Sequence, residues 1–128
     1  MSLKLLVVDD NAENRELALA ILKRLAMSNV EVFQAASGLE ALEVTFRERP
    51  VLILLDIMMP GMSGFEVCET IKSQSDLANI RIIMLTATDE STDRERAKQV
   101  GADGYMVKPY DILKLRTETQ QYLASLRA

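Results

Sequence analysis

Leu3-Lys4-Leu5-Leu6-Val7-Val8-Asp9-Asp10 and Val51-Leu52-Ile53-Leu54-Leu55-Asp56 are two apolar runs that each end in carboxylates. Runs almost uniform in Val, Ile and Leu are typical of strands buried on both faces of a parallel sheet. The other strand-like runs are Val30–Ala35, Arg81–Leu85 followed by Thr86, and Tyr105–Val107 followed by Lys108. Ligands of open parallel sheets bind outside the carboxyl ends of the strands. We therefore expect three carboxylates, one hydroxyl and one ammonium to meet at one sheet edge.

Helix signals lie between the strands. Apolar residues recur there every three or four positions, as on the buried face of a helix. The helices are expected from about Ala12 to Ala26, after capping boxes at Ser37 and Ser63, from about Ser91 to Val100 with Gly101 as the stop, and after a cap at Asp111. The residues expected on their apolar faces are Leu17, Ala18, Ile21, Leu22 and Leu25; Leu39, Leu42 and Phe46; Val67, Cys68 and Ile71; Ala97 and Val100; and Ile112, Leu115, Thr119, Tyr122 and Leu126.

The alternation of strands and helices predicts the fold class. It indicates an α/β fold, a doubly wound five-stranded parallel sheet with strand order 2-1-3-4-5 and five helices. Parallel neighbours need crossover connections, which are almost always right-handed. No internal repeat or linker interrupts the pattern, and 128 residues supply material for one core. We therefore expect a single domain over residues 1–128.

Composition argues against several function classes. The net charge of −4 and the pI near 4.9 argue against direct binding of nucleic acid. The single cysteine, Cys68, excludes an internal disulfide, and no apolar stretch approaches the ~20 residues of a membrane helix. The chain also begins with a strand rather than a signal peptide, so we expect a cytoplasmic protein without a membrane partner. With no histidine, it cannot serve as a phosphohistidine donor.

The residues at the strand ends form motifs in a fixed order. They are Asp9-Asp10, Asp56-Ile57-Met58-Met59-Pro60-Gly61-Met62-Ser63-Gly64, Thr86-Ala87, and Gly101-Ala102-Asp103-Gly104-Tyr105 with Lys108-Pro109. With these motifs in register from Leu3 to about Leu126, the chain resembles the response-regulator receiver domains of two-component signalling, which share the fold of the chemotaxis regulators.

The resemblance implies a phosphoacceptor switch that catalyses only its own phosphorylation and dephosphorylation, and so is not an enzyme in the usual sense. The donor would be a histidine kinase or a histidine phosphotransfer protein. The face formed by strand 4, helix 4 and strand 5 would change conformation to control an unidentified partner, in a monomer or a weak phosphorylation-dependent dimer. The implied roles are Asp56 as phosphoacceptor; Asp9, Asp10, Asp56 and the main-chain carbonyl of Met58 as ligands of Mg²⁺ or Mn²⁺; Thr86 and Lys108 as phosphate contacts; Tyr105 as a side chain that reorients with Thr86; and Pro109 as a candidate for a cis peptide bond after Lys108.

The chemistry of these residue types supports such roles independently. Aspartate is a nucleophile that forms acyl phosphates. Three carboxylates within ~4 Å of one another repel by several kcal/mol per pair even at an effective dielectric near 20, and Mg²⁺ prefers oxygen ligands. Lysine supplies a point charge for a phosphate oxygen. Phosphoryl transfer depends mainly on positioning and charge neutralisation, which this set of groups provides.

Each motif also has a simpler explanation when it is taken alone. Asp9 and Asp10 could open a helix whose N-terminus favours anions, with Asn11 as its cap. Asp56 could belong to a Pro-Gly turn, Thr86 could be a β-branched strand end, and Lys108 could be a solvated lysine beside a proline. Four such coincidences at one sheet edge are improbable, so the functional interpretation is favoured.

Several residues carry weaker signals. Cys68 is predicted to be inert core. Met58, Met59 and Met62 fit either an adaptable docking surface or the loop pattern of the family. Met58 offers no side-chain group to orient an attacking water, and Ser63, Gly104 and Val51 stand where many relatives have Asp. The change at Gly104 disfavours a dimer through helix 4, strand 5 and helix 5.

Three alternatives belong to other function classes or contexts. A flavodoxin-like FMN-binding protein would share the fold, but its phosphate loop would be rich in Ser, Thr and Gly, whereas Asp9, Asp10 and Asn11 repel phosphate unless a cation intervenes. A hydrolase with an aspartyl intermediate would often carry a second Asp two residues after the nucleophile, where Met58 stands. The chain could also be the receiver part of a longer regulator with a DNA-binding or enzymatic output domain.

Overall fold

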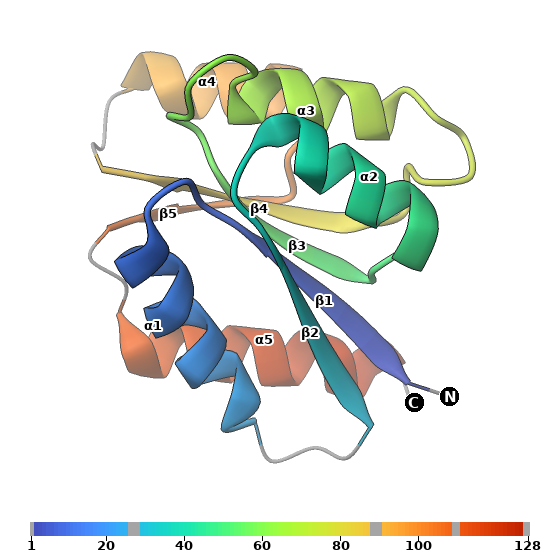
Figure 1. Cartoon of the computed structure of the whole chain (residues 1–128), viewed down its shortest axis with the longest axis vertical. Helices are drawn as coiled ribbons and strands as arrows, with labels where there is room; N and C mark the ends of the chain where they lie inside the picture. Colours follow the sequence, from blue (N-terminus) through green and yellow to red (C-terminus); the bar gives the residue numbers. More distant parts are fainter. Residues whose placement is uncertain (1, 26–28, 88–90, 109–110, 127–128) are drawn as a thin grey trace.

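The computed structural model describes residues 2–25, 29–87, 91–108 and 111–126. Strands and helices alternate along the chain (Figure 1). They are β1 (Leu3–Val8), α1 (Ala12–Lys23), β2 (Val30–Ala35), α2 (Gly38–Glu48), β3 (Leu52–Asp56), α3 (Gly64–Lys72), β4 (Arg81–Thr86), α4 (Ser91–Gln99), β5 (Gly104–Val107) and α5 (Ile112–Leu126). All paired strands are parallel and lie in the order β2-β1-β3-β4-β5. The predicted fold class and strand order are confirmed.

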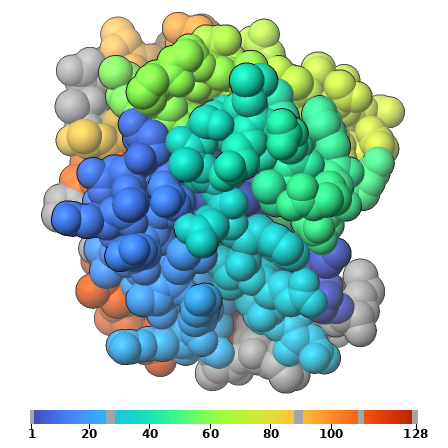
Figure 2. Space-filling model, in the orientation of Figure 1, coloured from blue at the N-terminus to red at the C-terminus, as the bar shows by residue number. Residues whose placement is uncertain are grey.

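The helices cover the sheet from both sides. Figure 1 shows α2, α3 and α4 on one face and α1 and α5 on the other. Two clusters of buried residues correspond to these layers, one under α2, α3 and α4 and the other under α1 and α5. In Figure 2, α1 and the segment from β2 to α2 cover most of one side of the molecule, and little of β1 can be seen between them. Double coverage explains why β1 and β3 are almost uniformly apolar.

Polar caps fix where four helices begin. The side-chain oxygens of Asn11, Ser37, Ser63 and Asp111 each accept a hydrogen bond from the backbone N–H three residues on. A cap of this kind stabilises a helix by about 1 kcal/mol, because it satisfies a backbone donor that the helix leaves free. The capping boxes predicted at Ser37 and Ser63 and the cap predicted at Asp111 therefore coincide with observed caps. The cap at Asn11, named in the simpler explanation of Asp9 and Asp10, is also present.

The predicted inner face of α2 is correct only at Leu42, which is partly buried against the core. Leu39 is 65% exposed and Phe46 is 46% exposed, whereas Ala41, Val44 and Thr45 face the sheet. Smaller side chains let the helix approach the strands closely. Thr45 can be buried because its hydroxyl donates to the Ala41 carbonyl oxygen at 2.7 Å, which satisfies the polar group within the helix.

Two other helices need smaller corrections. In α1, Leu17 is 41% exposed, and the helix ends at Lys23 with its cap at Arg24. It is shorter than the expected range, whose end at about Ala26 lies outside the described residues. In α5, Ile112 and Leu126 are exposed at the two ends of the helix. The buried stripe of α5 consists of Leu115, Thr119 and Leu123.

Helix α4 has few apolar anchors, as its sequence predicts. Ala97 is its one buried residue, and Val100 follows it in the core. Two arginines add contacts between α4 and its neighbours: Arg94 lies 4.7 Å from the centre of the Tyr105 ring and Arg96 lies 4.9 Å from that of Phe65. Gly101 ends the α4 region with a φ of +90°, a conformation that glycine adopts at low cost.

Cys68 belongs to the core. Its side chain is fully buried, its Sγ donates to the Val100 carbonyl oxygen at 3.5 Å, and burial raises the pKa of its thiol to about 11. The predicted place of Cys68 in the core is confirmed, and a raised pKa disfavours the reactive thiolate at neutral pH. Its inert chemistry stays a prediction. In the described part of the chain, no helix has the length and apolarity needed to cross a membrane.

Candidate metal centre and phosphoacceptor site

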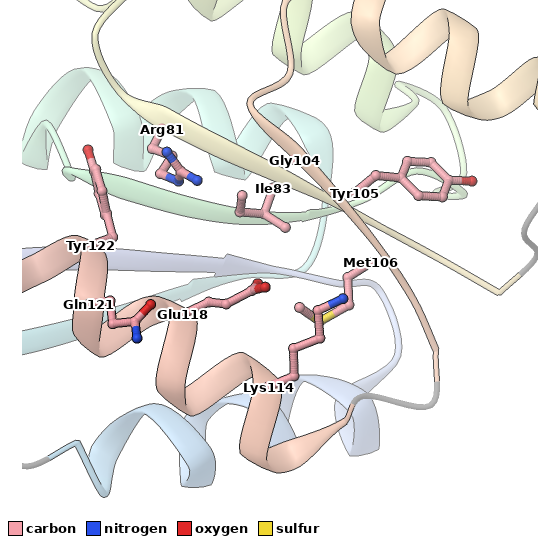
Figure 3. A pocket seen from close by; sticks show the side chains of 9 residues that line it. All are labelled: Arg81, Ile83, Gly104, Tyr105, Met106, Lys114, Glu118, Gln121 and Tyr122. Atoms are coloured by element: carbon pink, nitrogen blue, oxygen red, sulfur yellow. The ribbon is translucent and has the colours of Figure 1, made fainter.

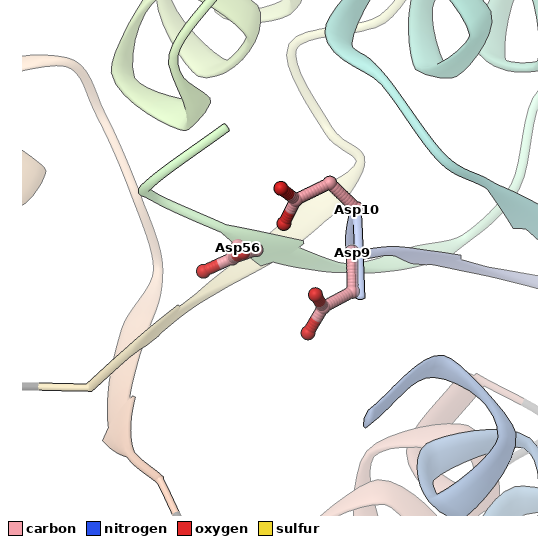
Figure 4. Close-up of side chains that lie close together, drawn as sticks. All are labelled: Asp9, Asp10 and Asp56. Atoms are coloured by element: carbon pink, nitrogen blue, oxygen red, sulfur yellow. The ribbon is translucent and has the colours of Figure 1, made fainter. Parts of the chain in front are cut away.

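Three carboxylates meet where β1 and β3 end. Asp9 follows β1 directly, Asp10 comes next, and Asp56 is the last residue of β3. One carboxylate oxygen from each lies within 4.8 Å of the others, and Figure 4 shows the three side chains together at this edge. Asp9 and Asp56 are buried, whereas Asp10 is exposed. The predicted convergence of these residues is therefore present.

Lys108, the residue after β5, adds a positive charge to the cluster. Its Nζ lies 2.7 Å from Asp9 Oδ2 and 3.3 Å from Asp56 Oδ1. Its backbone N–H donates to the Thr86 carbonyl oxygen at 2.6 Å, so the end of β4 and the residue after β5 are held side by side. Thr86 itself is buried. Neighbouring parallel strands thus bring the three aspartates, Thr86 and Lys108 to the carboxyl edge of the sheet.

The cluster carries more negative than positive charge. Three carboxylates face one ammonium group, and burial raises the pKa of Asp56 to about 6, with the charge of Asp9 adding to this rise and Lys108 opposing it. Ionised Asp56 is therefore costly unless another cation is close. Carboxylate oxygens at this spacing are the ligands that Mg²⁺ and Mn²⁺ prefer. The residues present fit a divalent cation at this edge.

Two residues that sequence reasoning missed hold the turn after β1. Arg15 Nη1 donates to the Asp9 carbonyl oxygen at 2.9 Å, and Arg15 Nε donates to Gln34 Oε1 at 3.0 Å. The Asn11 N–H donates to Asp9 Oδ1 at 2.9 Å. An arginine in the first turns of a helix is usually solvated, so the sequence carries no signal for these contacts.

A glycine allows α3 to approach the end of β3. A Cβ on Gly64 would lie 2.3 Å from the Asp56 carbonyl oxygen, too close for any side chain without a shift of the backbone. The Gly64 N–H donates to the Ile57 carbonyl oxygen at 2.9 Å across the same contact. Gly64 is part of the quoted motif, but its packing role was not predicted.

The methionines after Asp56 occupy different environments. Met58 is 72% exposed, Met59 is buried in the core, and Met62 is partly buried against it. A docking surface formed by all three is therefore wrong, because the backbone turn directs Met59 inward. The role of the Met58 main-chain carbonyl as a metal ligand stays a prediction.

The predicted switch residues lie on neighbouring strands. Tyr105 in β5 is partly buried under α4, where its ring is stacked with Arg94, and Thr86 ends β4. Thr86 pairs with Val107 in the sheet, two residues beyond Tyr105. Pro109 lies outside the described residues.

A separate hollow of about 460 Å³ lies between α5 and the strands β4 and β5. Figure 3 shows Lys114 and Glu118 of α5 directed toward these strands, while the Tyr105 ring points away from α5. Gly104 contributes no side chain here, and a Cβ on it would lie 2.6 Å from Ile83 Cδ1. None of the acidic cluster lines this hollow, so it is distinct from the candidate metal site.

The family model of the response regulator receiver domain matches residues 5–120. The chain belongs to the response regulator receiver family. Receiver domains are signalling switches rather than conventional enzymes, and the family binds divalent metal ions.

Sequence relatives of this receiver domain differ in length. Sporulation initiation phosphotransferase F of Bacillus subtilis (strain 168) is 37% identical over 123 residues, which cover 96% of this chain and 95% of that protein. The probable transcriptional regulator ycf27 of Porphyridium aerugineum is 39% identical over 120 residues, which cover 94% of this chain and 48% of that protein. This chain spans about half the length of the transcriptional regulators that it matches.

Solved structures share the same fold. The chemotaxis protein CheY4 of Vibrio cholerae has a TM-score of 0.84 and 33% identity, covering 95% of this chain and 98% of that chain. The Mn²⁺-bound form of the response regulator Rcp1 has a TM-score of 0.79 and 26% identity, covering 92% of this chain and 89% of that chain.

Proposed function

We propose that this receiver domain is a phosphoacceptor switch in which Asp56 takes the phosphoryl group. One observation carries the proposal: Asp56 ends β3 within reach of two further carboxylates and of the Lys108 ammonium. The family membership favours this proposal over a flavin-binding protein of the same fold. It also favours it over a hydrolase, because receiver domains are switches.

The transfer step follows from the positions of these side chains. A carboxylate oxygen of Asp56 attacks phosphorus, the new oxygen–phosphorus bond forms, and the bond from phosphorus to the donor's histidine nitrogen breaks, leaving its electron pair on that nitrogen. Lys108 lies beside Asp56 and would neutralise a phosphoryl oxygen. Asp9, Asp10, Asp56 and the Met58 carbonyl would hold the Mg²⁺ or Mn²⁺. When bound, the ion supplies charge neutralisation for the carboxylates and the incoming phosphoryl group.

The response would spread from Thr86 to α4. The Thr86 hydroxyl would bind a phosphoryl oxygen, and Tyr105 would move with it. Moving α4 costs little because Ala97 is its one buried residue, and weakly anchored segments are where switches are usually found. The face formed by β4, α4 and β5 would thereby gain or lose affinity for a partner.

The absence of histidine and the similarity to response regulators indicate which kinds of protein would be partners. A histidine kinase or histidine phosphotransfer protein would be the donor, since the chain has no histidine of its own. The downstream partner would be a protein rather than nucleic acid, and we propose a cytoplasmic location and a receiver domain that is a monomer or a weak phosphorylation-dependent dimer. The half-length match to transcriptional regulators supports the alternative that this is the receiver part of a longer regulator.

Intact-mass measurement after incubation with acetyl phosphate tests the proposal. We expect wild type to gain one phosphoryl group with Mg²⁺ and none in excess chelator, and Asp56→Asn to gain none. Asp76→Asn is the matched control, because Asp76 is an exposed aspartate that pairs with Arg49 rather than with the cluster. Full labelling of Asp56→Asn, or labelling of wild type that is unaffected by chelator, would refute the proposal.

A further inference from the structure

Arg15 in α1 contacts the backbone of the turn that carries the acidic pair. β1 and β2 pair up to Val8 and Ala35, and the Asp9 N–H still donates to the Ala35 carbonyl oxygen at 3.2 Å. β2 ends at Ala35, so the regular ladder stops there. The Asp9 carbonyl oxygen accepts its hydrogen bond from Arg15 Nη1 at 2.9 Å. A side chain thus takes the place of the next donor of the sheet.

A second contact fixes the orientation of the guanidinium. Arg15 Nε donates to Gln34 Oε1 at 3.0 Å, and Gln34 belongs to β2. Guanidinium donors lie in one plane in a rigid fork, so bonds to two different acceptors define where the group sits. Arg15 therefore ties α1 to β2 and to the end of β1 at once.

The bonded carbonyl controls the direction of Asp10. The carbonyl of Asp9 and the N–H of Asp10 belong to one planar peptide group. The Asp9 carboxylate is held by Lys108 and by the Asn11 N–H, and the bond from Asn11 closes a turn around this peptide group. The central peptide of such a turn can flip between two orientations while the bond that closes the turn is kept. The bond from Arg15 restricts this rotation, and with it the direction in which the exposed Asp10 side chain projects.

We infer that Arg15 is a positioning residue of the metal site, which fixes Asp10 through the peptide group between Asp9 and Asp10. The inference rests on the proposed metal site. Some residues do not bind the metal but hydrogen-bond to its ligands. Replacing such a residue typically weakens metal binding 10–100-fold. Arg15 acts through the main chain of an exposed ligand, so we expect the lower end, about tenfold.

Charge and position act in opposite directions at Arg15. The guanidinium is a cation bonded to the main chain of Asp9, and it repels a metal ion at the site. Removing its charge alone would strengthen metal binding, whereas releasing the peptide group would weaken it. The sign of the change in affinity therefore separates the two roles.

Calorimetric titration of the full chain with Mg²⁺ and with Mn²⁺ tests the inference. Arg15→Met is expected to raise the Kd about tenfold. Gln34→Ala leaves the charge in place and loosens the guanidinium, so a smaller rise in Kd is expected. Arg49→Met is the matched control: it removes an exposed guanidinium that is paired with Asp76 at 2.8 Å near the opposite end of β3, and it should leave the Kd unchanged.

A second readout uses the metal-free protein. Hydrogen exchange of the Asp10 amide should be faster in Arg15→Met than in wild type, and unchanged in Arg49→Met. A Kd for Arg15→Met at or below the wild-type value would overturn the inference. If Arg15→Met does not fold, Gln34→Ala serves as the test. An unchanged Kd for Mg²⁺ and Mn²⁺ in Gln34→Ala would then overturn the inference. Failure of wild type to bind either cation would refute the proposed metal site itself.

Discussion

The ammonium of Lys108 lies 3.3 Å from the carboxylate of Asp56, at the meeting point of segments that are far apart in the sequence. Parallel topology produces this contact, because the residue after β5 and the last residue of β3 end at the same edge of the sheet. A single ammonium shared with Asp9 does not balance three carboxylates, and burial of Asp56 makes the imbalance costly.

Asp56→Asn should raise the melting temperature of the metal-free protein near neutral pH. Burial raises the pKa of Asp56 from 3.8 to about 6, so between these values the folded protein holds a proton that the unfolded chain has lost. Wild-type stability therefore falls as pH rises through this window, and the advantage of the variant grows over the same range. Thermal unfolding in excess chelator across this range measures it.

Asp76→Asn is a control in which the expected change in stability has the opposite sign. Its hydrogen bond with Arg49 lowers the pKa of Asp76, so ionised Asp76 stabilises the fold above its unfolded pKa, and the variant should be slightly less stable at neutral pH. An advantage of Asp56→Asn that does not change with pH would contradict the electrostatic explanation.

Asp10→Asn should weaken Mg²⁺ binding more than Asp9→Asn. Asp10 is exposed, whereas both carboxylate oxygens of Asp9 already accept hydrogen bonds, from the Asn11 N–H and from Lys108. Asp10 is therefore the carboxylate better placed to bind the ion directly, with Asp9 acting partly through water. Metal titration of the two variants compares them, and an affinity unchanged in both would place the cation elsewhere.

The fold could be predicted because β1 and β3 are buried on both faces and because the helix caps are polar. The site could be predicted because strand order alone brings Asp9, Asp56, Thr86 and Lys108 to one edge. The contacts of Arg15 could not, since they depend on β2 ending one residue after Gln34.

The sequence also did not predict which face of α2 lies against the sheet. Helix α2 has two stripes of residues with the same periodicity, and the one with smaller side chains, Ala41, Val44 and Thr45, lies against the sheet. Sequence periodicity favours the larger Leu39 and Phe46, because it counts hydrophobicity and not the space between a helix and a strand.

Thr86→Ala should still be phosphorylated but should lose the response of α4. The hydroxyl is not the nucleophile, and its proposed role is to bind the phosphoryl oxygen once it is present. Hydrogen exchange of α4 before and after phosphorylation measures the response, with Thr86→Ser as the control that keeps the hydroxyl. A full response of α4 in Thr86→Ala would show that coupling does not pass through this side chain.

Met58→Asn should shorten the lifetime of the phosphorylated state. Hydrolysis needs a water in line with phosphorus, and the exposed Met58 side chain cannot hydrogen-bond to it. An amide restores such a group without changing the main-chain carbonyl, and Met58→Leu is the apolar control. Decay of the phosphoryl mass over time gives the lifetime. An equal or longer lifetime in Met58→Asn would mean that this position does not control the water.

Peptide mapping of the phosphorylated wild-type protein tests the central claim most directly. After labelling with acetyl phosphate and Mg²⁺, we expect one phosphoryl group per chain, located on Asp56 alone. Stoichiometric label on Asp9, Asp10 or Thr86, with Asp56 unmodified, would contradict the assignment of Asp56 as the phosphoacceptor.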